Sequence, residues 1–130
     1  METEIILCDT NIFIHWFDGN AEIDHVLRSD IGLKYIGLPS IVYMELLQGM
    51  GNKNELTVMR KRIEKFHIVD ITEPISKRTR EYIKTYSLSH KLQIPDAFIA
   101  ATAVEYNLRL FTYNLKDFRF IPDIKLYQKE

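Results

Sequence analysis

The sequence predicts an α/β domain with a mostly parallel sheet of four to five strands. Short apolar runs, typical of buried strands, alternate with longer segments in which apolar residues recur at helical spacing. The chain has 130 residues, which suits one domain with one good hydrophobic core, and it contains no internal repeat. We therefore expect residues 1–130 to form a single domain.

The first elements follow from the pattern near the N-terminus. A continuous apolar run at residues 4–9 predicts a strand that is buried on both faces. Residues 10–17 predict a short helix or helical turn whose N-cap is Thr10 or Asn11. Helical spacing appears again at residues 20–29, which predicts a second helix.

A second strand is expected at residues 33–38, where Pro39 ends it, and Ser40 suits the N-cap of the helix that follows. That helix contains Glu45, which a repeat of 3.6 residues per turn places on an apolar face. A carboxylate taken out of water is costly unless it is paired, bound to a metal or protonated. We therefore expect Glu45 to be buried and to have a specific partner.

The second half of the chain alternates in the same way. In order, it predicts an amphipathic helix at residues 54–66, a buried strand at 67–71, a long polar helix at 74–90, a helix at 94–107 with Pro95 in its first turn, a strand at 108–112 and a weak fifth strand at 124–128.

Composition excludes several classes of protein. The net charge is -1, so no global basic field indicates nucleic acid, although a local patch could bind it. The single cysteine, Cys8, excludes an internal disulfide and a zinc site built on thiolates. No apolar stretch reaches the ~20 residues of a membrane span, and the acidic N-terminus lacks the layout of a signal peptide. We expect a cytoplasmic protein with no membrane partner.

Acidic side chains gather at one expected edge of the sheet. Asp9 ends the first strand, and Asn114 and Asp117 follow the fourth. Asp96 lies in the first turn of the helix before that strand, and Glu45 lies in the second turn of the helix after strand two. Ligands bind beyond the carboxyl ends of the strands in open parallel sheets. The pattern therefore predicts that these carboxylates share one site.

Converging carboxylates repel one another, so an opposite charge is needed to neutralise them. A hard divalent cation with oxygen ligands meets this need, and Mg²⁺ or Mn²⁺ suits a site of few carboxylates plus water. Such an ion polarises a phosphoryl centre and activates water. The sequence therefore predicts metal-dependent chemistry on a phosphate ester.

Each acid also has a simpler explanation when it is taken alone. Asp9 could cap the helix that follows it, and Asp96 could complement a helix dipole. Glu45 could form a structural ion pair with a buried cation. Asp117 could be an ordinary loop acid. These explanations account for each acid singly but not for their shared edge, which favours the metal cluster.

Four stretches in order carry a resemblance to a known family: "LCDTNIFI", "PSIVYMELLQG", "IPDAFIAATA" and "LFTYNLKDF". Together they resemble the PIN domain of VapC-type toxins, the metal-dependent ribonucleases of bacterial and archaeal toxin–antitoxin pairs. The similarity spans nearly the whole chain. It implies a PIN-like three-layer α/β/α sandwich.

The resemblance also implies the functional residues. It assigns catalytic acids at Asp9, Glu45 and Asp96, with Asp117 or Asn114 at a fourth position, and supporting roles at Asn11 and Thr112, which would orient the acids. Asp9 and Asp96 would be the main metal ligands. Glu45 and Asp117 could complete the set.

The function that the resemblance implies is a Mg²⁺- or Mn²⁺-dependent endoribonuclease, the toxin of a VapBC-type pair, which cleaves tRNA, rRNA or mRNA. Its partners would be a VapB-like antitoxin and a second copy in a homodimer. Apolar residues of the early helices, with Trp16 and Phe17 as candidates, would lie near the dimer interface. An aspartyl-phosphate enzyme would need a second acid beside Asp9, where the chain has Thr10 and Asn11. A catalytically silent PIN-like scaffold that binds RNA or protein is the other alternative.

Two helices carry basic side chains that this site does not explain. Arg60, Lys61, Arg62 and Lys65 form a basic side of one helix, and Lys77, Arg78, Arg80 and Lys84 form one on another. A solvated helix face is the common cause of such a pattern. A contact with RNA or a protein partner is the alternative.

Overall fold

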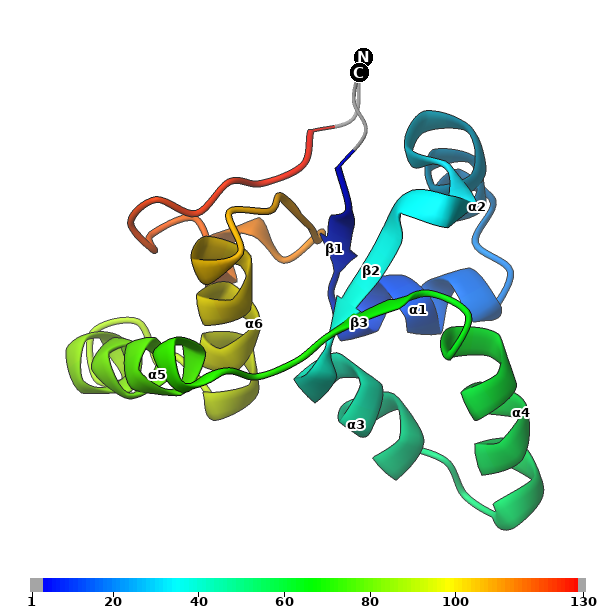
Figure 1. Ribbon diagram of the computed structural model, residues 1–130, viewed down its shortest axis with the longest axis horizontal. Helices are drawn as coiled ribbons and strands as arrows, with labels where there is room; N and C mark the ends of the chain where they lie inside the picture. The colour runs from blue at the N-terminus through cyan, green and yellow to red at the C-terminus, as the bar shows by residue number, and fades with distance from the viewer. Residues whose placement is uncertain (1–3, 129–130) are drawn as a thin grey trace.

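A computed structural model describes residues 4–128 and contains one parallel sheet with the strand order β3-β2-β1-β4 (Figure 1). The strands are β1 (Ile6–Cys8), β2 (Ile36–Pro39), β3 (His67–Val69) and β4 (Leu110–Phe111). This arrangement confirms the predicted α/β sandwich.

Strand β1 lies inside the sheet and fixes its register. Leu7 pairs with Gly37 of β2 on one side and with Leu110 of β4 on the other. All three residues of β1 are buried, as the continuous apolar run predicted. An ideal Cβ on Gly37 would stand 2.4 Å from the Ile5 side chain, so only glycine fits at this point of β2.

Two strand predictions need correction. The third strand was expected to be buried, but His67 and Ile68 are exposed, on a strand that has only β2 as a neighbour. The weak fifth strand is reduced to one parallel bridge between Leu110 and Leu126.

The helices occupy the predicted regions in most cases. They are α1 (Thr10–Phe17), α2 (Ala21–His25), α3 (Ser40–Gln48), α4 (Lys53–Ile63), α5 (Glu73–Tyr86) and α6 (Ile94–Glu105), with a π-helical turn at Val26–Ile31 and 3₁₀ turns at Leu33–Tyr35 and Leu115–Asp117. The single helix expected at residues 20–29 is therefore an α-helix followed by a π-helical turn.

The N-caps of α1 and α3 differ from the prediction. Asp9, not Thr10 or Asn11, caps α1, and its carboxylate accepts a hydrogen bond from the Ile12 amide at 3.2 Å. Pro39, not Ser40, precedes α3 and makes no side-chain cap bond. Both helices begin one residue earlier than expected because each strand runs into its helix with almost no connecting turn.

In Figure 1, α5 and α6 lie to one side of the strands, and α2 and α4 lie to the other. Helix α6 packs closely because Ala97, Ala100 and Ala103 leave room for its neighbours, and all three are buried. Polar side chains converge at the carboxyl ends of the strands, where α1 and α3 begin.

Among residues 4–128, the helices are too short or too polar to span a membrane.

Candidate active site

A cavity of about 150 Å³ lies at the carboxyl end of the sheet. Its walls are formed by Asp9, Thr10, Asn11, Glu45, Asp96, Ile99 and Asn114. These residues come from the ends of two strands and from the first two turns of α1, α3 and α6. Three of the four predicted acids therefore reach one small cavity.

Asp9 is held firmly from two sides. It directly follows β1 and is buried, and one carboxylate oxygen accepts the bond from Ile12 that caps α1. The other oxygen accepts a hydrogen bond from the Thr112 hydroxyl at 2.5 Å, and that hydroxyl in turn accepts one from the backbone N–H of Asn114 at 3.0 Å. Burial raises the pKa of Asp9 above its usual range, and the bonds from Thr112 and the α1 amides offset part of this rise.

Glu45 is partnered by a hydroxyl group and not by a cation. The Thr10 hydroxyl donates to its carboxylate at 2.6 Å. None of the ion pairs found within residues 4–128 includes Glu45, so the structural ion pair considered for it is not present there. The expected burial also needs correction. Glu45 is only partly buried, because the fully buried face of α3 is formed by Val42 and Leu46.

Asp96 lies in the first turn of α6 and is partly buried. The pKa of its carboxyl group is raised to about 6, first by burial and then by the negative charges of Asp117, Asp9 and Glu45. The four acids that the sequence selected are therefore close enough to repel one another through the protein.

The two candidates for the fourth position lie in different places. Asn114 is exposed and forms part of the cavity wall. Asp117, at the end of the 3₁₀ turn, does not form part of that wall, but its charge affects Asp96 more than any other charge does. Asn114 therefore lines the cavity, and the carboxylate of Asp117 lies outside its wall.

The supporting residues also have distinct places. Thr112 donates to Asp9, and Asn11 lines the cavity. Sequence reasoning missed Thr10, which it treated only as a helix cap. The available signal was a hydroxyl group next to the first acid in the "DTN" stretch. Its partner Glu45 is 35 residues away, so local sequence could not identify the contact.

The donor set suits a hard cation that keeps part of its water. The polar side chains around the cavity offer carboxylate, hydroxyl and amide oxygens, and neither histidine nor cysteine lines it. Within residues 4–128, no three His, Cys, Asp or Glu side chains form a ready-made metal-binding group. Mg²⁺ does not need such a group, because one or two carboxylates and several waters usually hold it. Burial first, and neighbouring carboxylates second, raise the pKa values of Asp9 and Asp96, and a bound cation would favour the ionised form of both groups.

Solved structures with the same fold come from toxin–antitoxin complexes. A chain of a toxin–antitoxin complex from Klebsiella pneumoniae is 33% identical, with 92% of this chain and 94% of that chain covered and a TM-score of 0.75. Two more distant matches show the fold alone. One is VapBC2 from Rickettsia felis bound to a DNA fragment from its promoter, at 24% identity, 97% and 99% coverage and a TM-score of 0.78. The other is DNA-bound VapBC from Salmonella typhimurium, at 22% identity, 96% and 98% coverage and a TM-score of 0.79.

A comparison with curated proteins gives no match. The sequence pattern of the PIN domain family, however, matches residues 6–122, which is most of the chain. The match includes every strand of the sheet and the full set of predicted acids. The resemblance inferred from the four sequence stretches is thereby confirmed, and the chain belongs to the PIN domain family.

Proposed function

We propose that this protein is a metal-dependent endoribonuclease and the toxin of a VapBC-type toxin–antitoxin pair in the cytoplasm. The observation that carries the proposal is the convergence of Asp9, Glu45 and Asp96 on one cavity, with Asp117 close enough for its charge to raise the pKa of Asp96. Its support from the comparisons is membership of the PIN domain family and 33% identity to a chain of a toxin–antitoxin complex. The substrate class is RNA.

The proposed roles of the residues follow from their contacts. Asp9 and Asp96 are the main ligands of Mg²⁺ or Mn²⁺, and such an ion, when bound, polarises the phosphoryl group and makes water a stronger nucleophile. Thr112 keeps a carboxylate oxygen of Asp9 in place. Glu45, which Thr10 orients, is only partly buried and can accept a proton from the attacking water. Asp117 and Asn114 flank Asp96 and the cavity.

Cleavage of a structured RNA tests the proposal. Purified protein is incubated with tRNA in the presence of Mg²⁺ or Mn²⁺, and again with excess chelator. We expect cleavage only with metal. Asp96→Asn should abolish it, whereas Asp123→Asn is the matched control, because Asp123 is exposed and asparagine tolerates its positive φ of 66°. Cleavage that persists in chelator would exclude the metal mechanism.

The main alternative is a silent PIN-like scaffold that binds RNA or protein without cutting. Burial and mutual repulsion raise the pKa of Asp9 and Asp96, which costs stability in the metal-free protein. A scaffold gains nothing from this cost, so the arrangement favours the enzyme. Tight RNA binding without cleavage in either metal would support the scaffold instead.

An antitoxin partner is part of the proposal. A cavity ringed by carboxylates attracts a cationic side chain, and arginine binds carboxylates in a bidentate manner. We expect a segment of a VapB-like antitoxin to place an arginine or lysine near Asp9, Glu45 and Asp96. Co-expression with the neighbouring gene product, followed by size-exclusion chromatography and an RNase assay, checks this. Separate elution, or joint elution with undiminished cleavage, would contradict it.

A homodimer is also proposed. The sequence suggested Trp16 and Phe17 for its interface, but both are partly buried, and the apolar surface along α5 and α6 is the better candidate. A cavity of about 400 Å³ between these helices has Ile83 and Phe98 among its lining residues. Nearby, Ile94 is 60% exposed and Leu88 is 95% exposed. Light scattering on the purified protein should give twice the monomer mass, and Ile94→Lys should shift it toward the monomer. A wild-type protein that is monomeric at all concentrations would contradict the proposal.

A further inference from the structure

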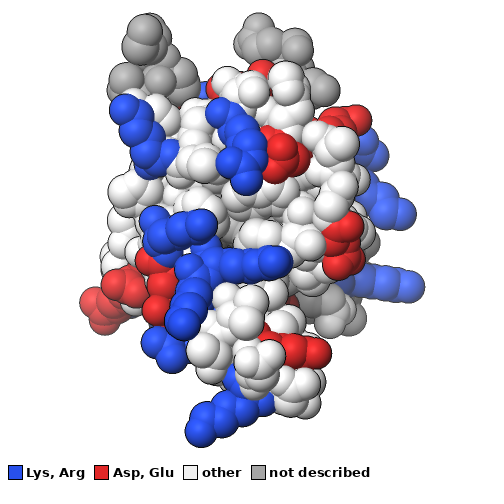
Figure 2. Space-filling view, turned by 90° about the vertical axis from the view of Figure 1, so that its right-hand side faces the viewer, with Lys and Arg blue, Asp and Glu red and all other residues white. Residues whose placement is uncertain are grey.

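Another cavity, of about 340 Å³, lies outside the candidate active site, at the C-terminal end of α1, and among residues 4–128 Asp24 is its one acidic lining residue. Three aromatic rings and three cations line it: Trp16, Phe17 and Phe66, with Arg28, Arg62 and Lys65. The side of the molecule that Figure 2 presents carries a gathering of Lys and Arg side chains around an uncharged surface. The catalytic proposal above gives this cavity no role.

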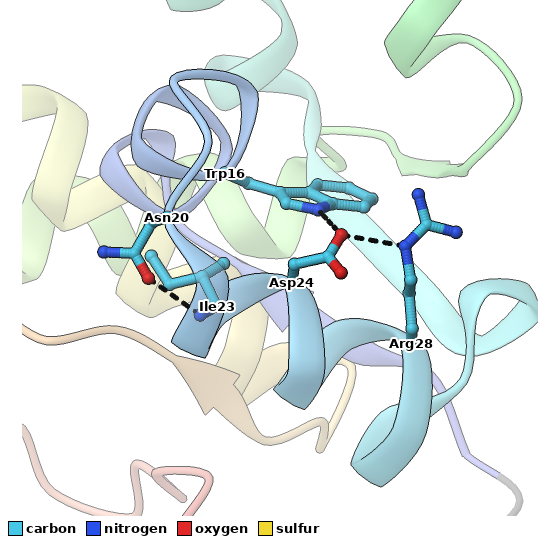
Figure 3. A network of polar contacts seen from close by, with 5 residues as sticks. All are labelled: Trp16, Asn20, Ile23, Asp24 and Arg28. Atoms are coloured by element: carbon cyan, nitrogen blue, oxygen red, sulfur yellow. Dashed lines mark hydrogen bonds and ion pairs between the residues drawn. The ribbon is translucent and has the colours of Figure 1, made fainter.

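The three aromatic rings pack into one cluster, in which Trp16 and Phe17 are partly exposed and Phe66 is buried beneath them. Trp16 stacks on Phe17 with their ring centres 5.3 Å apart, and its ring lies 5.8 Å from that of Phe66. Figure 3 shows how Trp16 is held: its indole N–H donates to Asp24 at 2.8 Å, and the same carboxylate oxygen accepts a bond from Arg28 at 2.8 Å. The orientation of the indole is therefore set by protein contacts before any ligand arrives.

The charge on this surface is positive. Asp24 is already neutralised by Arg28. Arg62 lies over Phe17 at 4.8 Å from the ring centre, and Lys65 lies over Phe66 at 5.8 Å. No carboxylate within residues 4–128 forms an ion pair with Arg62 or Lys65. Two positive charges at the cavity therefore lack an acidic partner among these residues.

We propose that this cavity binds a single-stranded segment of the RNA substrate, with phosphates on Arg62 and Lys65 and a base against the aromatic rings. The inference rests on the proposed ribonuclease function. Aromatic rings beside cations match the chemistry of single-stranded RNA, in which bases stack and phosphates need positive charge. An acidic protein segment would use the cations but would not need three planar rings.

The position of the cavity supports this assignment. An acid cluster repels a polyanion, and the chain as a whole has a net charge of -1, so the RNA must be attracted elsewhere. Helix α1 joins the two places, with Asp9 at its N-cap and Trp16 in its last turn. Seven residues of α-helix span about 10 Å. One RNA strand can therefore contact the cavity while its scissile phosphate lies at the acids.

Trp16 gives a direct test because it is the only tryptophan of the chain. A single-stranded oligouridylate is added to the full-length protein in chelator, so that it is not cut, and tryptophan fluorescence is recorded. We expect saturable quenching that weakens as salt is raised. Poly-L-glutamate with the same number of charges should quench much less.

Matched variants locate the contact. Arg62→Gln with Lys65→Gln should weaken oligouridylate binding roughly five-fold and reduce the salt slope by about 1.4, because each phosphate contact on single strands contributes ~0.7. Lys53→Gln with Lys125→Gln removes the same charge from exposed positions outside this cavity and outside α5 and α6, and should leave binding and slope unchanged. In the cleavage assay with metal, Arg62→Gln with Lys65→Gln should raise KM and leave kcat unaltered. This is the result expected when the lost contacts bind the substrate and the transition state equally well.

The possible outcomes separate this inference from the proposed function. Cleavage by the wild type without quenching of Trp16, or equal effects of the two double variants, would overturn the RNA site while the nuclease survives. Quenching by poly-L-glutamate equal to or greater than that by oligouridylate would assign the cavity to an acidic protein segment and overturn it as well. Quenching that needs Arg62 and Lys65 in a protein without nuclease activity would support the site and contradict the proposed function.

Discussion

The Thr10 hydroxyl donates a hydrogen bond of 2.6 Å to the Glu45 carboxylate and so connects the start of α1 to the second turn of α3. A second hydroxyl, that of Thr112, donates to Asp9 across 103 residues of sequence. Two of the four acids are therefore oriented by threonines and not by cations. Their negative charge is left uncompensated, which is what a metal-binding cavity requires.

The Thr10 contact predicts a loss of activity without a loss of fold. Thr10→Val keeps the branched shape and removes the hydroxyl, so Glu45 should lose its orientation and kcat/KM should fall about ten-fold, in line with a hydrogen bond to a charged group. Thr10→Ser should retain most of the activity. RNA cleavage kinetics and thermal melting of the three proteins check this. Equal activity of the valine and serine variants would show that the bond does not matter for catalysis.

Asp9 caps helix α1 in addition to its proposed role as a metal ligand, and two substitutions separate these roles. Asp9→Asn and Asp9→Ala both remove the charge, and both should be inactive. Asparagine is as good an N-cap as aspartate, whereas alanine leaves the Ile12 amide without its partner. The alanine variant should therefore be less stable than the asparagine variant by about 1 kcal/mol. Urea unfolding of the two variants at one pH measures this, and equal midpoints would contradict the capping role.

Stability should depend on pH through Asp96. Its pKa is about 6 in the folded protein against 3.8 for the ordinary group, so the folded state holds the proton more tightly. The metal-free protein should lose stability as pH rises from about 4 to 6 and stay less stable above that range. Asp96→Asn should therefore be more stable than the wild type at pH 7, by about 1 kcal/mol after screening by solvent.

The same comparison has a built-in control. The two proteins should converge in stability below about pH 3, where Asp96 is protonated in both the folded and the unfolded state. Urea unfolding in chelator at a series of pH values provides the measurement. A wild type that gains stability relative to Asp96→Asn between pH 4 and 7 would show that the environment of Asp96 favours its ionised form.

Metal affinity should rise with pH over the same range. Asp96 must lose its proton to bind a cation, so with a pKa of about 6 the affinity for Mn²⁺ should be roughly ten-fold weaker at pH 5 than at pH 7. Calorimetry in two buffers of different ionisation enthalpy would detect the released proton. Asp96→Asn should bind more weakly and with less dependence on pH. An affinity independent of pH would remove Asp96 from the ligand set.

Much of the fold could be predicted because its signals are local. The buried run at β1 and the small residues of α6 follow from the polarity and size of neighbouring residues, which the sequence records directly. The same holds for the placement of the acids, since Asp9 and Asp96 stand immediately after a strand and at a helix start. Parallel strands bring their carboxyl ends to one edge of the sheet, so the convergence of the acids could be predicted from the sequence alone.

Other features depend on how the elements pack. The exposure of β3 depends on which parts of the sheet other elements cover, since the other edge strand, β4, is buried. The partial exposure of Glu45 depends on which side of α3 meets the core, and periodicity fixes that face only approximately.

The N-caps depend on the residue at which the backbone leaves the extended conformation. For α1 the sequence offered Thr10 or Asn11 and, separately, Asp9, which is the cap. For α3 it indicated Ser40, whereas the cap position is Pro39.

The sequence by itself determined the alternation of strands and helices and the set of acids, because hydrophobic periodicity and strand ends are properties of short segments. Only the tertiary structure decided that Thr10 contacts Glu45 and that Arg62 lies over Phe17. Such contacts join segments far apart in the chain, and side-chain packing and helix orientation fix them. No local pattern encodes that geometry.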